Sequence, residues 1–178
     1  MYGSFFIYMG RLELIAFFSG YPVIYAFITA FAGKGTLRFI VPEKIVSLLP
    51  VSYALVGTLY FGFKLKTWYP DYSVENIRHS TTHPYLVLWA LLSMIFWIPA
   101  IAKRRLASLI HSLVFFFLLI NDFYLLTTDT GADRYIGAND MKLYGASILI
   151  NACALITIAL LFYLLGWLKS KNSLPGTR

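Results

Sequence analysis

The stretch Leu143–Leu168, LYGASILINACALITIALLFYLLGWL, runs for 26 residues without a charge and stops at Lys169 and Lys171. About 20 helical residues, each rising 1.5 Å, cross the roughly 30 Å hydrocarbon core of a bilayer. The stretch is therefore long enough to span a membrane as a single helix. It predicts that the chain folds in a lipid bilayer.

Four further apolar runs precede it, in a chain of 178 residues that is 59 % hydrophobic and 13 % charged and has a mean hydropathy of +0.70. Each run is about twice the length of a barrel strand and none alternates in polarity, so we expect helices. The sequence predicts an all-α integral membrane protein, a single transmembrane domain over residues 1–178 with about five spans. The expected spans lie near residues 12–33, 45–63, 84–102, 105–126 and 143–168.

The distribution of basic residues predicts the orientation. If all five runs cross the membrane, nine of the 15 lysines and arginines fall on one side, including the short Lys103–Arg105 turn. The positive-inside rule then places the N-terminus outside and the C-terminus in the cytoplasm. We expect residues 64–83 to form an outer loop with a short amphipathic helix, and residues 169–178 to form a flexible tail. We expect a multi-pass protein in a bacterial cytoplasmic membrane.

Three polar side chains inside the expected spans are candidate functional residues. His111 and Asp122 are eleven positions apart on one span and lie on nearly the same helical face, while Asn151 lies on the last span. Ionisable groups at membrane depth are costly and often functional, so a proton or ion route is one interpretation. The interpretation we favour is structural, with His111 hydrogen-bonded to a neighbouring helix and Asp122 among the lipid headgroups.

Small and polar residues in the outer half of the last span indicate a helix-packing face. Ser147, Asn151 and Ala154 follow i, i+4, i+7 spacing, and Gly145 lies close by. Small side chains let helices approach closely, and an asparagine can hydrogen-bond across the contact. We expect this face to pack against another helix, either of this chain or of a partner.

The expected outer loop contains the candidate metal ligands Glu75, His79 and His83, spaced four residues apart. Two histidines and a carboxylate can hold zinc with an open coordination position. Pro84, however, disfavours helical geometry at His83, and Glu75 with His79 also fits an ordinary solvated helix face, which is the interpretation we favour.

The sequence contains no known catalytic motif, and we therefore predict no catalytic residues. We expect neither a metal nor haem, because no second histidine lies in a span to pair with His111 as an axial ligand. A bound lipid or quinone remains open. The net charge of +7 is distributed beside the apolar runs, which favours lipid headgroups and not nucleic acid.

Three functional classes remain at the level of sequence. The one we favour is an accessory or scaffolding subunit of a larger membrane complex, with membrane lipids and other subunits, or further copies of itself, as partners. The alternative is a small oligomeric transporter or channel. The third is a membrane redox or metal-dependent enzyme subunit.

Overall fold

The computed structural model describes residues 12–32, 43–81, 83–128 and 134–172. Within these residues the regular structure is helical and contains no strand, which confirms the predicted all-α class for the described part of the chain. Residues 12–18 are helical, and a turn at Ser19 and Gly20 separates them from α2. The labelled helices are α2 (Tyr21–Ala32), α3 (Glu43–Trp68), α4 (Val74–Ser80), α5 (Pro84–Leu92), η2 (Ser93–Trp97), α6 (Pro99–Ala102), α7 (Arg105–Thr128) and α8 (Arg134–Asn172).

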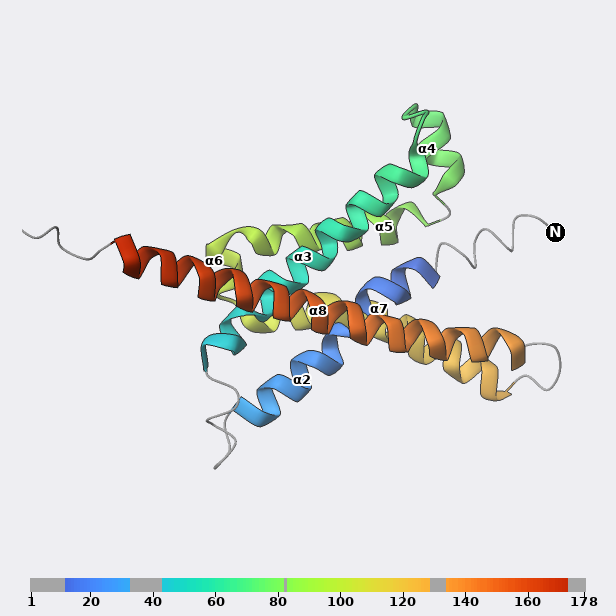
Figure 1. The fold of residues 1–178 in the computed structure, drawn as a ribbon. Helices are drawn as coiled ribbons and strands as arrows, with labels where there is room; N and C mark the ends of the chain where they lie inside the picture. Colours follow the sequence, from blue (N-terminus) through green and yellow to red (C-terminus); the bar gives the residue numbers. More distant parts are fainter. Residues whose placement is uncertain (1–11, 33–42, 82, 129–133, 173–178) are drawn as a thin grey trace, which may run out of the picture.

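Three helical segments are long and apolar enough to cross a membrane, namely Leu12–Phe31, Lys44–Trp68 and Lys142–Lys171. Two of the other expected spans are represented by shorter apolar helices, Pro84–Trp97 and Arg105–Asn121. Successive segments alternate in direction, so that the end of α2, the start of α3, the α6–α7 turn and the end of α8 lie toward one end of the molecule (Figure 1).

The sequence predicts one continuous helix over residues 84–102, but the third apolar run is not continuous in the structure. It is divided into α5, the 3₁₀ segment η2 and the short α6. Pro99 begins α6, and Ile98 before it is extended, with φ −75° and ψ 118°. A proline disfavours helical geometry at the preceding residue and lacks an N–H, which explains the break.

Gly57 on α3 allows η2 to pack closely. A Cβ at this position would lie 1.9 Å from Ser93 Oγ, so only glycine leaves room for the present arrangement. Because Ser93 is fully buried against α3, the broken run contributes to the core although it is irregular.

The last helix is longer than the predicted span. α8 contains 39 residues, which corresponds to about 58 Å at 1.5 Å per residue. It begins at Arg134, before the predicted start at Leu143, and continues through Lys169 and Lys171 of the predicted tail. Since a hydrocarbon core is roughly 30 Å thick, such a helix extends beyond it.

Helical structure also enters the predicted outer loop. α3 continues to Trp68, and α4 starts at Val74 with Ser73 as its N-cap, because Ser73 Oγ accepts a hydrogen bond from the Asn76 N–H at 3.2 Å. A short helix, α4, therefore lies within residues 64–83.

The core is unusually aromatic. Phe18 stacks on Phe115 with ring centroids 4.7 Å apart, and the Tyr21 and Tyr53 centroids are 4.3 Å apart. All four side chains are fully buried, and they come from the first helical segments, α3 and α7. Aromatic contacts therefore hold these segments together around the polar groups described next.

Candidate functional site

His111 lies in an aromatic cage at the centre of the helical assembly. Its Nδ1 is 2.8 Å from the hydroxyl of Tyr53 on α3. The imidazole stacks on Trp89 of α5, with centroids 4.7 Å apart and an angle of 5° between the rings. The Trp89 Nε1–H also donates to the His111 carbonyl at 3.1 Å, so one tryptophan positions both the ring and the backbone.

Among the described residues, only one of the two imidazole nitrogens of His111 has a hydrogen-bond partner. His111 Nε2 is buried and has no hydrogen-bond partner among the described residues. Phe96 and Phe115 are its other aromatic neighbours, with centroids 6.0 and 6.3 Å away. The contacts of His111 thus connect α3, α5, η2 and α7, which is a packing role for a histidine on an apolar helix.

Asp122, the other member of the predicted polar face, belongs to α7, but its side chain lies outside the described residues. Because the helix is continuous from His111 to Asp122, their backbones are separated along its axis by roughly 16 Å. They are not in direct contact at that separation.

A second polar cluster crosses the break in the first apolar run. The Gly20 N–H donates to Ser147 Oγ at 2.8 Å, and Asn151 Nδ2 donates to the Phe17 carbonyl at 2.8 Å. Pro22 lies just after this break and cannot donate a backbone hydrogen bond. Side chains of α8 therefore bind backbone groups that flank the break, and we call this set the α8 crossing.

The two backbones nearly touch at the α8 crossing. A Cβ on Gly20 would lie 2.5 Å from Ile148 N and 2.7 Å from Ser147 O. Those neighbours are backbone atoms of a helix, which cannot move aside cheaply. Gly20 is therefore required by the close approach of the two segments.

The predicted packing residues divide between two faces of α8. Ser147, Asn151 and Ala154 are buried toward the rest of the chain. Gly145 is exposed, and a Cβ there would meet nothing within 4 Å. Because Gly145 lies two residues from Ser147, the helical twist turns it away from the α8 crossing.

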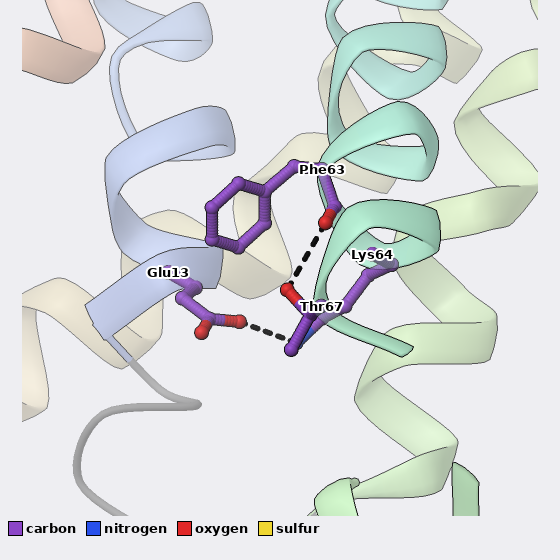
Figure 2. A network of polar contacts seen from close by, with 4 residues as sticks. All are labelled: Glu13, Phe63, Lys64 and Thr67. Atoms are coloured by element: carbon purple, nitrogen blue, oxygen red, sulfur yellow. Dashed lines mark hydrogen bonds and ion pairs between the residues drawn. The ribbon is translucent and has the colours of Figure 1, made fainter. Parts of the chain in front are cut away.

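An ion pair joins the start of the first helical segment to the far end of α3. Glu13 Oε2 and Lys64 Nζ are in direct contact, and Figure 2 shows the carboxylate and the amine facing each other between the two helices. The Lys64 side chain is only 4 % exposed and that of Glu13 is 22 % exposed. Such a buried pair is costly to break on one side, because the remaining charge stays desolvated.

Of the predicted metal ligands, Glu75 is exposed and His83 is half-buried, while the His79 side chain lies outside the described residues. Within the described part of the chain no group of three or more histidine, cysteine, aspartate or glutamate residues could hold a metal ion.

Comparison of the chain with models of protein families, with curated proteins and with solved structures finds no match.

Sequence reasoning missed three of these partners, namely Tyr53, Glu13 and Lys64. Two signals were present. Tyr53 is a polar aromatic residue in the middle of an apolar run, and Glu13 and Lys64 occupy the same end of two successive antiparallel runs. Opposite charges at matching ends of adjacent helices are natural partners. The side chains of His111, Ser147 and Asn151 each bond to a group on another helical segment.

Proposed function

We propose that this protein is an accessory or scaffolding subunit of a larger membrane complex and acts through helix–helix and lipid contacts. In this proposal the five apolar runs cross a bacterial cytoplasmic membrane, with the N-terminus outside and the C-terminus in the cytoplasm. The alternating direction of the segments supports this topology (Figure 1). It gathers Lys44, Lys103–Arg105 and Lys169 toward one end, where the positive-inside rule requires them.

The observation that carries the proposal is the outward surface of α8. In the most apolar part of Lys142–Lys171 only 22 % of the residues are buried by the rest of the chain, against 56 % for Lys44–Trp68. The longest helix thus leaves most of its apolar surface for lipid or for another protein.

One outward face of α8 is suited to another helix. Gly145, Leu149, Cys153 and Ile156 are all exposed and follow i, i+4, i+8, i+11 spacing. Because the glycine and the cysteine are small, a second helix can approach closely there. We call these four residues the outer α8 face and propose it as the contact with the partner subunit.

The polar core supports the same class. His111 and Asn151 bind Tyr53 and the Phe17 carbonyl, respectively, so both contribute to holding helices together. The transporter or channel alternative would use His111, Asp122 and Asn151 as a route, and the enzyme alternative would use a metal or quinone. We rank both below the subunit proposal, since the described contacts of His111 and Asn151 already assign them a structural task.

Gly145→Leu tests the proposal. A Cβ at this position meets nothing within 4 Å in this chain, so the fold should persist while a partner helix is held away. Gly62→Leu on α3 is the matched control, because its Cβ also projects into open space. The tagged protein is extracted gently from its native membrane, and native mass spectrometry identifies the subunits that accompany it.

We expect a stoichiometric foreign subunit with the wild type and with Gly62→Leu. Its recovery should fall about tenfold with Gly145→Leu, which corresponds to a loss of roughly 1.4 kcal/mol of binding free energy. A chain that always purifies alone, or a partner that Gly145→Leu does not displace, would contradict the proposal.

A further inference from the structure

A groove opens at the end of the molecule where α3 begins and α8 ends. Its volume is about 760 Å³, and its walls include Leu48, Ala159, Tyr163, Gly166 and Trp167. A second hollow of about 420 Å³ reaches from it toward the α6–α7 turn. Ser47 and Phe162 line both, so the two hollows are adjacent, and together they are here called the basal groove.

The walls of the basal groove are mainly apolar, while its charged lining residues are all basic. These residues are Lys44 at the start of α3, Lys103 in the α6–α7 turn and Arg105 at the start of α7. In the part of the chain that the structure describes, none of the three forms an ion pair. The neighbouring acid Glu43 has a side chain outside the described residues.

Two further features add positive potential. Lys171 Nζ lies 5.3 Å from the centre of the Trp167 ring, which forms part of the groove wall. The helices α3 and α7 both begin beside the groove, at Glu43 and Arg105, and helix N-termini carry partial positive charge. The basal groove therefore combines apolar walls with basic residues from α3, the α6–α7 turn, α7 and α8.

That combination selects for an amphiphile with an acidic head. A volume of several hundred Å³ is typical of sites for small molecules, and apolar walls suit an alkyl chain. A soluble anion would use the cations but leave the apolar walls in contact with water. A neutral lipid would use the walls but leave the cations without a partner.

We propose that the basal groove binds an anionic phospholipid, with its phosphate among Lys44, Lys103 and Arg105. One acyl chain follows Leu48 and Gly166. This inference rests on the membrane location in the proposed function, and it adds a defined lipid site on the last turns of α8, farther along the helix than the outer α8 face.

Native mass spectrometry of the full chain in nanodiscs tests the inference. The nanodiscs contain equal amounts of phosphatidylglycerol and phosphatidylcholine, and the lipids that remain bound after release are counted. One variant carries Lys44→Gln, Lys103→Gln and Arg105→Gln. Its matched control carries Lys66→Gln, Arg78→Gln and Lys142→Gln, which remove three exposed basic residues elsewhere on the molecule.

We expect the wild type and the control to retain phosphatidylglycerol in preference to phosphatidylcholine. In the groove variant the ratio of retained phosphatidylglycerol to phosphatidylcholine should fall at least about tenfold. Each basic residue beside an anionic headgroup strengthens lipid binding several-fold. Equal retention of both lipids by the wild type, or an equal loss with both triple variants, would overturn the inference. Displacement of the lipid by inorganic phosphate would overturn it as well.

A second pair of variants tests the apolar part. Gly166 lines the groove, and a Cβ there meets nothing within 4 Å. Gly166→Leu should therefore reduce lipid retention, while Gly62→Leu should not. Unchanged retention with Gly166→Leu would contradict an acyl chain in this position.

Extraction of native membranes with alkaline carbonate distinguishes a failure of the lipid site from a failure of the proposed function. If the protein stays in the membrane but shows no lipid preference, only the lipid site is contradicted. If carbonate releases the protein from the membrane, the proposed function is contradicted as well.

Discussion

Gly20 is the residue at which the first helical segment meets the backbone of α8. Replacing it with alanine places a Cβ 2.5 Å from Ile148 N, and the neighbouring atoms belong to helical backbone. We expect Gly20→Ala to destabilise the protein by about 1–3 kcal/mol, the range for overpacked sites. The apparent Tm in detergent, followed by size-exclusion chromatography after heating, measures the loss.

Gly62→Ala is the control for Gly20→Ala. Its Cβ meets nothing within 4 Å, and alanine is favoured over glycine in helices by about 0.8–1 kcal/mol in water. The two substitutions should therefore move Tm in opposite directions. If Gly20→Ala were as stable as the wild type, the α8 crossing could not be as close as described.

Tyr53 and Tyr60 provide a matched test of the cage around His111. Both side chains are fully buried on α3, but only the Tyr53 hydroxyl contacts His111, while the Tyr60 hydroxyl has no hydrogen-bond partner among the described residues. Tyr53→Phe should cost about 1–3 kcal/mol, because it leaves a buried imidazole nitrogen without its partner.

Tyr60→Phe removes a buried polar group that has no bond to lose, so it should be neutral or stabilising. Thermal unfolding of both variants under the same detergent conditions checks the difference. Equal destabilisation by the two substitutions would show that the hydroxyl of Tyr53 is not the source of the effect.

The polar residues at this scale were predictable in kind but not in pairing. Composition alone singles out His111, Ser147 and Asn151 as unusual in apolar helices. Their partners are a tyrosine on another helix and backbone groups freed by a helix break. No spacing rule within a single helix contains that information, because it depends on how separate helices cross.

The ion pair between Glu13 and Lys64 acts at the scale of helical elements, since it fixes the start of the first segment against the end of α3. Lys64 is the more deeply buried partner, with 4 % of its side chain exposed. Glu13→Gln should therefore cost more than Lys64→Met, of order 3–5 kcal/mol for a fully uncompensated buried charge.

The double variant Glu13→Gln/Lys64→Met should be more stable than the sum of the single effects predicts, because no charge is then left alone. A double-mutant cycle on thermal stability gives the coupling. Strict additivity would mean that the two side chains do not stabilise each other.

The element boundaries explain where sequence-based prediction failed. The predicted spans are bounded by charged residues, so the prediction treats residues 84–102 as one run. Pro99 within that run nevertheless indicates a break at Ile98. The prediction likewise ends the last run at charged residues, whereas α8 continues through Lys142 and Lys169. Charge limits the part of a helix that lies in lipid, and it does not limit the helix itself.

At the scale of the whole molecule, the proposed topology predicts which loops are reachable from outside the cell. Arg78 on α4 and Arg104 in the α6–α7 turn are both exposed and lie toward opposite ends (Figure 1). In a background with the single cysteine Cys153 replaced by serine, Arg78→Cys should react with a membrane-impermeant maleimide on intact cells. Arg104→Cys should react only after the cells are opened.

Labelling of Arg104→Cys, but not of Arg78→Cys, on intact cells would mean that the chain is inserted the other way round. Labelling of both on intact cells would contradict the multi-pass arrangement. Gel-shift detection of the maleimide on the purified chain gives each result directly.

The helical class followed from the sequence because long uncharged runs allow few other structures in lipid. The function did not follow from the sequence. The polar side chains of the core bond to other groups of this chain, and the outer surface of α8 is mainly apolar. A surface of leucine, isoleucine and small residues can face lipid or protein alike, and only a partner distinguishes the two.

Site-specific photo-crosslinking in the native membrane tests the central claim, that the outer α8 face binds another subunit. A photoreactive phenylalanine analogue replaces Leu149 on this face, and Leu88 on α5 is the control, since both are 65 % exposed. We expect one discrete protein adduct from position 149, lost with Gly145→Leu, and only lipid adducts from position 88. Lipid adducts alone from both positions would contradict it.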